Sequence, residues 1–195
     1  SSGSRVHAEQ VLITKGAGQA VARVGAVARD EERAFIGETS TFIGVPQAFL
    51  LFGHSVTTVP WDDEGVDLKA LRAAAGQART LLHTCPDFQN PTGRTMTLER
   101  RRELVAWANE TDAVVLEDAI ARDLRFEGEN VESPFSLLPP GRRILVGSVP
   151  KSLLAGLRGV SLARQAPVTA DRPPVQRGEV AARPVEEAGR SIPEG

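Results

Sequence analysis

The chain has 195 residues, 41% of them hydrophobic and 25% charged, and its net charge of −2 gives no electrostatic reason to expect nucleic-acid binding. Its single cysteine, Cys85, excludes an intrachain disulfide, and no apolar run approaches the ~20 residues that a membrane span requires. Residues 1–10 also lack the apolar core of a signal peptide, so we expect a cytoplasmic protein that does not bind membranes.

Short apolar runs that are typical of strands alternate with helical patterns along the chain. Asp67 and Thr97 are predicted to cap two of the helices, and residues 100–102, three arginines, are expected to face water. Because strands and helices alternate, the sequence predicts an α/β fold, with a mostly parallel sheet and helices on both faces. The predicted strands are 11–13, 34–37, 55–59, 80–85, 113–116, 144–146 and 160–163.

The composition changes near the end of the sequence. Residues 166–195 are rich in Pro, Arg, Glu, Ala and Gly, contain no aromatic residue and show little periodicity, which predicts a disordered or loosely packed tail. We therefore divide the chain into an N-terminal segment (1–10), one α/β domain (11–165) and this tail (166–195).

Four residues that can bind a ligand each follow a different predicted strand: Gly16, Asn90, Asp118 and Lys151. Ligands of parallel α/β sheets bind beyond the carboxyl ends of the strands, so we expect these four residues to share one site. The glycine-rich turn at 16–18 precedes a helical pattern. It either offers backbone N–H groups to a phosphate or only makes the turn.

Lys151 lies in the Gly- and Ser-rich stretch 147–159, shortly after an apolar run. The amine of a lysine can condense with an aldehyde when its surroundings favour the neutral form. Ser148 and Arg158 can hold an anion beside that aldehyde, and an aldehyde with an attached phosphate describes pyridoxal 5'-phosphate (PLP). On this stretch alone, a solvated loop lysine among ordinary turn residues is the alternative interpretation.

Three motifs occur in a recognisable order: PDFQNPTG (86–93), VVLEDAIARDLRFEG (114–128) and GSVPKSLLAGLRG (147–159). Together they resemble the large domain of fold-type I PLP-dependent aminotransferases of class I/II. They are especially similar to the aminotransferase-like domain of GntR/MocR-type regulators. The resemblance covers about residues 6–166 and implies a PLP-dependent transferase large domain.

The resemblance implies a role for each matching residue. Lys151 matches the lysine that forms the internal aldimine and moves protons during catalysis, and Asp118 matches the carboxylate that pairs with the pyridine nitrogen. Asn90 matches the residue that hydrogen-bonds the 3-oxygen of the ring, and Phe42 falls where the family has an aromatic residue stacked on it. The implied phosphate ligands are Ser148, Arg158 and the backbone N–H groups around Gly16 and Ala17.

The chain also departs from the family pattern. The usual tyrosine after the aspartate is replaced by Ile120 and Ala121, and the residue before Lys151 is proline instead of the frequent serine. Neither the N-terminal segment nor the small domain of the family is recognisable, so we expect a truncated large domain with the small domain absent. No winged helix precedes residue 10, so this chain alone is not expected to bind nucleic acid.

Two functions are compatible with these residues. The first is a PLP-dependent aminotransferase that acts on an amino acid or keto acid through a Lys151 aldimine, with a homodimer expected because family sites lie between subunits. The alternative is a truncated PLP-binding or catalytically inactive module that works through a partner or as a regulator fragment. His54 and His83 are interpreted as core or loop histidines and Cys85 as a buried apolar residue. No metal site is predicted.

Overall fold

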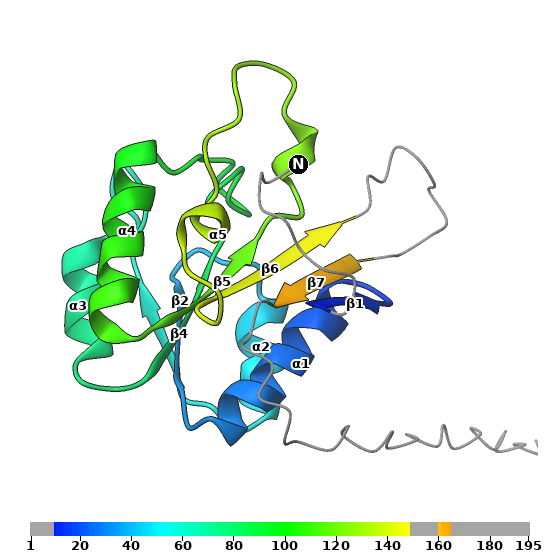
Figure 1. The fold of residues 1–195 in the computed structure, drawn as a ribbon, viewed down its shortest axis with the longest axis vertical. Helices are drawn as coiled ribbons and strands as arrows, with labels where there is room; N and C mark the ends of the chain where they lie inside the picture. Colours follow the sequence, from blue (N-terminus) through cyan, green and yellow to red (C-terminus); the bar gives the residue numbers. More distant parts are fainter. Residues whose placement is uncertain (1–9, 149–159, 165–195) are drawn as a thin grey trace, which may run out of the picture.

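The computed structural model describes residues 10–148 and 160–164, which form one sheet with helices on both sides (Figure 1). The described sheet has seven strands in the order β1-β7-β6-β5-β4-β2-β3. The strands from β2 to β6 pair in parallel, whereas β7 runs antiparallel between β6 and β1. This confirms the mostly parallel sheet. The strands are β1 (Val11–Thr14), β2 (Ala34–Glu38), β3 (Val56–Val59), β4 (Thr80–Thr84), β5 (Val114–Asp118), β6 (Arg143–Ser148) and β7 (Val160–Arg164).

Helices cover both faces of this sheet (Figure 1). The first two helices pack on one face and the other three on the opposite face, which separates the apolar interior into two clusters. Within the described residues no helix is long and apolar enough to cross a bilayer. The helices are α1 (Ala17–Asp30), α2 (Gly44–Leu51), α3 (Leu68–Ala75), α4 (Leu98–Thr111) and α5 (Pro134–Leu137), with a short 3₁₀ helix at Arg122–Leu124.

The central strands are buried on both faces, as expected for parallel strands that are covered by helices. Successive side chains of a strand point to opposite faces, so Val114 and Leu116 pack against α1 and α2, whereas Val115 packs against α3 and α4. The same alternation continues to the end of β5. Asp118 therefore points to the α1/α2 side, and Glu117 points to the side of α4 and α5.

The helix caps follow the sequence prediction. Asp67 Oδ1 accepts hydrogen bonds from the N–H groups of Lys69 (2.8 Å) and Ala70 (3.0 Å), which begins α3. Thr97 Oγ1 accepts one from the N–H of Arg100 (3.2 Å), which begins α4. These side chains supply acceptors to N–H groups that have no partner within the helix.

The prediction that residues 100–102 face water is wrong for two of the three arginines. Arg100 is 8% exposed and Arg101 is fully buried, while Arg102 is exposed. The reason is that both arginines have tertiary partners. The Arg100 guanidinium donates to Asp62 Oδ2 at 2.7 Å and to Glu64 Oε2 at 3.0 Å. The partner of Arg101 lies 14 residues earlier in the chain. The Arg101 guanidinium donates to both carboxylate oxygens of Asp87, at 2.9 and 3.2 Å, and to the carbonyl oxygen of Pro86 at 2.9 Å.

Candidate functional site

A pocket of about 280 Å³ lies at the carboxyl ends of β2, β4 and β5 and beside the first turns of α1 and α2. Its size is near the lower end of small-molecule sites, roughly 300 Å³. Four of the residues that the sequence singled out line it together: Ala17, Phe42, Asn90 and Asp118. Of the four residues expected to converge from separate strand ends, Asn90 and Asp118 line this pocket, and Gly16 directly precedes the lining residue Ala17.

Of the other predicted site residues, two lie near the pocket and two lie outside the described residues. Gly16 directly precedes Ala17 and is the N-cap of α1, and Ser148 is the last residue of β6. β6 pairs with β5 through Asp118 and Val146, so the end of β6 lies beside the strand that carries the pocket carboxylate. Lys151, Arg158 and the predicted tail (166–195) lie outside the described residues.

The N-terminus of α1 forms one wall of the pocket through Ala17 and Gly18. Gly16 has φ 147°, a value that side chains disfavour, and no side chain caps the helix. The first turn contains no acidic residue, so nothing there competes for an anion. The first N–H groups of a helix lack partners within it and carry the positive end of the helix dipole. This wall can therefore accept an anionic group.

Asp118 ends β5 and presents a partly shielded carboxylate to the pocket. Its side chain is 17% exposed, and its Oδ1 accepts a hydrogen bond from the N–H of Ile120 at 3.1 Å. Its Oδ2 lies 3.7 Å from Nε2 of His83, a residue of β4 that also lines the pocket. The sequence interpretation of His83 was a core or loop histidine. The available signal was alternation: His83 follows Leu81 by two residues and so faces the α1/α2 side, like Asp118.

The loop that carries Asn90 is held by hydrogen bonds to the buried carboxylate of Glu38. Glu38 accepts hydrogen bonds from Thr84 Oγ1 (2.6 Å), from the N–H of Cys85 (3.0 Å) and from Gln89 Nε2 (3.2 Å). Asn90, the next residue, is exposed and lines the pocket. The hydrogen bonds to Glu38 therefore fix the loop that presents the Asn90 amide to the pocket.

Phe42 lies at the rim of the pocket and is 56% exposed. Its ring runs so close to the start of α2 that a Cβ on Gly44 would come within 2.6 Å of its Cε1 atom. A glycine at position 44 therefore allows the ring to occupy this place. Cys85 lines the floor and is buried, as expected, and burial, with the nearby Asp118 carboxylate, raises the pKa of its thiol.

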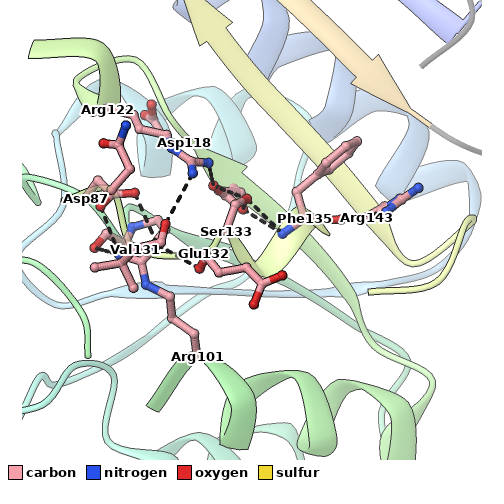
Figure 2. A network of polar contacts seen from close by, with 12 residues as sticks. Asp87, Arg101, Asp118, Arg122, Val131, Glu132, Ser133, Phe135 and Arg143 are labelled. Carbon is pink, nitrogen blue, oxygen red and sulfur yellow. Dashed lines mark hydrogen bonds and ion pairs between the residues drawn. The ribbon is translucent and has the colours of Figure 1, made fainter. Parts of the chain in front are cut away.

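Figure 2 shows a second polar cluster, on the opposite side of the sheet, that anchors the segment after Asp118. Glu117 is fully buried and accepts hydrogen bonds from Ser133 Oγ (2.6 and 2.7 Å) and from the N–H of Phe135 (2.8 Å). Burial raises the pKa of Glu117, and these donors partly offset the effect. Asp87 binds both Arg101 and Arg125 in the same cluster.

Taken together, the fold and the pocket define an α/β protein with an anion-accepting helix terminus, a carboxylate and an aromatic rim at one sheet edge. The family model described as aminotransferase class I and II matches residues 2–170, so the chain belongs to the class I and II aminotransferase family. The residues that occupy the family's tyrosine positions, Ile120 and Ala121, both line the pocket.

Curated relatives fall into enzymes and regulators. The chain is 40% identical over 158 residues to a 2-aminoadipate transaminase of Thermus thermophilus, covering 78% of this chain and 40% of that protein. It is 32% identical over 147 residues to the HTH-type pyridoxine biosynthesis transcriptional regulator PdxR of Corynebacterium glutamicum, covering 75% of this chain and 31% of the regulator.

Among solved structures, the chain is similar to LysN, an alpha-aminoadipate aminotransferase from Thermus thermophilus complexed with N-(5'-phosphopyridoxyl)-L-leucine. The TM-score is 0.72 with 38% sequence identity, and the match covers 80% of this chain and 41% of LysN. The chain thus spans about two fifths of the length of these enzyme relatives.

Proposed function

We propose that the pocket binds pyridoxal 5'-phosphate and that Lys151 attaches it covalently. The observation that carries this proposal is the position of Asp118, a shielded carboxylate that shares one pocket with Phe42, Asn90 and the N-terminus of α1. The phosphopyridoxyl compound bound to the similar LysN structure supports the choice of cofactor.

The donor set fits this cofactor. The N–H groups at Ala17 and Gly18 suit its phosphate, with Ser148 and Arg158 as the further proposed ligands. Asp118 would hold a proton on the pyridine nitrogen, Asn90 would donate to the 3-oxygen, and Phe42 would pack on the ring face. When bound, PLP supplies an electron sink for the substrate carbanion. The Lys151 amine moves the substrate proton.

The reaction that we propose is the exchange of an amino group between an amino acid and a keto acid. A homodimer is part of this proposal, since Phe42 at the rim and its neighbour Ile43 in the chain are 56% and 64% exposed, and a second copy can cover them. One observation favours the alternative, a PLP-binding module without transaminase activity: Ile120 and Ala121 bring no hydroxyl group to the pocket.

Cofactor binding is tested by adding PLP to the purified chain, reducing with borohydride and mapping the modified peptide by mass spectrometry. We expect attachment at Lys151 and its loss in Lys151→Ala. The matched control is Lys69→Ala, because Lys69 is exposed on α3 on the other side of the sheet. Equal labelling of the wild type and Lys151→Ala would show that the proposal is wrong.

Transamination is tested separately by incubating the chain and PLP with a keto-acid acceptor and a panel of amino acids that starts with 2-aminoadipate, the compound in the name of the Thermus relative, and following the keto acid formed from each amino acid. Product formation supports the enzyme. Attachment of PLP at Lys151 without any product supports the binding module instead.

A further inference from the structure

We propose that a second pocket, separate from the proposed cofactor pocket, binds a small oxyanion such as a phosphate or a carboxylate. It has a volume of about 190 Å³ and lies at the carboxyl ends of β2 and β3, beside the loop that carries Asn90. None of its lining residues lines the first pocket, so this proposal does not depend on cofactor binding. The lining residues that carry the proposal are Thr39, Ser40, Trp61, Gln89, Thr92 and Arg94.

The position of this pocket follows from the fold. Thr39 and Ser40 directly follow β2, and Trp61 comes two residues after β3, which is a parallel neighbour of β2. Both turns therefore lie at the edge of the sheet where α/β proteins bind ligands. The other neighbour of β2 is β4, and the loop after β4 brings Arg94 to the same pocket.

Arg94 carries the only charge among the residues that line this pocket. Its Nη2 donates to the carbonyl oxygen of Asp62 at 2.6 Å, while its Nε and Nη1 make no hydrogen bond with the described residues. The guanidinium lies over the ring of Trp61, with Cζ 5.9 Å from the ring centroid. A guanidinium has five N–H donors in a planar fork that suits the oxygens of carboxylates and phosphates. The pocket is thus lined by a cation that has donors to spare.

Further donors of this pocket lack acceptors. Thr39 and Ser40 are exposed, and their hydroxyl groups make no hydrogen bond with the described residues. The Nε1–H of Trp61 is buried and also has no acceptor in that part of the chain. A buried donor without an acceptor is unfavourable, and native structures rarely contain one. The excess of donors over acceptors suits a ligand that is rich in acceptor oxygens.

The acidic residues next to the pocket are largely engaged elsewhere. Asp62 Oδ2 binds Arg100 at 2.7 Å, and its Oδ1 accepts two N–H groups of the following turn, at 2.9 and 3.1 Å. The Glu64 carboxylate also binds Arg100, at 3.0 Å. Asp63 has its Oδ1 3.5 Å from Nη2 of Arg94, but its side chain is fully exposed, and such surface pairs contribute little. A bound anion can therefore replace Asp63 beside Arg94 at small cost.

Gln89 connects the second pocket to the first. Its Nε2 donates to the carbonyl oxygen of Ser40, and its Oε1 accepts from the hydroxyl group of Thr92. Asn90, the next residue, lines the first pocket. An oxyanion beside Ser40 and Thr92 would therefore contact residues that hold the loop of Asn90 in place.

Binding is tested in the full chain without PLP, by tryptophan fluorescence during titration with sodium phosphate and, separately, with sodium glutarate at constant ionic strength. The chain has two tryptophans, and Trp107 is fully buried in the core, so Trp61 reports on the pocket. We expect a saturable change. A response to phosphate alone assigns a phosphate ligand, and a response to glutarate alone assigns a carboxylate. No saturable change with either anion overturns the proposal.

Variants locate the site. Arg94→Gln removes the charge, and we expect the Kd of the anion to rise about tenfold or more, because a charge-assisted hydrogen bond is lost. Thr39→Val leaves Arg94 in place and should raise the Kd severalfold. Arg102→Gln, at an exposed position of α4, is the matched control and should bind like the wild type. Because Arg94 also lies over Trp61, each Kd is measured by calorimetry as well. Equal affinities of the wild type and Arg94→Gln overturn the proposal, whatever the outcome of PLP attachment at Lys151.

Discussion

Glu117 and Asp118 are adjacent at the end of β5, yet their carboxylates meet opposite surroundings. Glu117 is fully buried, accepts hydrogen bonds from the Ser133 hydroxyl and the N–H of Phe135, and has Arg122 at 3.9 Å. Asp118 has one backbone donor and an imidazole at 3.7 Å, and it opens on a pocket. The alternation of one strand therefore separates an acid that stabilises the fold from an acid that is available to a ligand.

The largest effect is expected on the Glu117 side of the sheet, at the buried pair of Arg101 and Asp87. Arg101→Ala removes two hydrogen bonds to a carboxylate that is 2% exposed and leaves it with Arg125 at 3.1 Å. We expect a loss of about 3–5 kcal/mol in the free energy of unfolding, measured by urea denaturation. Arg102→Ala, at the exposed neighbouring position, should change it by less than ~0.5 kcal/mol. Similar losses in both variants would contradict the structural role.

The second effect concerns the pH dependence of stability. Burial raises the pKa of Glu117 above its ordinary value of 4.5. The contribution of Glu117 to the free energy of unfolding is therefore fully present below the pKa that this group has in the unfolded chain. It is lost as pH rises through the pKa of Glu117 in the folded chain. We expect Glu117→Gln to become more stable relative to the wild type as pH rises above 4.5. Unfolding curves recorded at several pH values test this, with Glu99→Gln at an exposed position of α4 as the control. Parallel pH profiles of Glu117→Gln and the wild type would contradict it.

The smallest effect on stability is expected at Asp118. Asp118→Asn keeps an oxygen that can accept the N–H of Ile120, and the side chain is partly exposed, so the free energy of unfolding should change by less than ~1 kcal/mol. The same variant should bind PLP much more weakly, because a neutral amide does not hold the proton on the pyridine nitrogen. Titration with PLP beside urea denaturation measures both. A large loss of stability would mean that the two acids do not differ as described.

The sequence predicted the parts of this protein that depend on local pattern. The apolar runs located the strands to within a few residues, because strands buried on both faces have continuous apolar sequences. The positions of Asn90 and Asp118 after separate strands predicted that they meet, since parallel strands end at one edge. The roles of Lys151 and Arg158 remain predictions, because both lie outside the described residues.

What the sequence did not predict depends on partners that are distant along the chain. Arg101 is buried because Asp87 receives it, and nothing in the helical pattern of 98–111 indicates that partner. His83 has no motif around it, and its place beside Asp118 follows only from the pairing of β4 with β5. Both cases are side-chain contacts between elements, which alternation and spacing alone do not specify.

The antiparallel placement of β7 has a consequence for the order in which the chain acquires its structure. Within the described sheet, the one strand that hydrogen-bonds β1 is β7, so Val11 cannot pair until Ala163 is present. On the ribosome β1 emerges long before β7 has been synthesised. Ile13 of β1 is 79% exposed even in the folded structure, where the two strands are paired. Joining these two distant segments is thus a late, entropically costly closure, which a nascent chain completes only once residue 164 has left the exit tunnel.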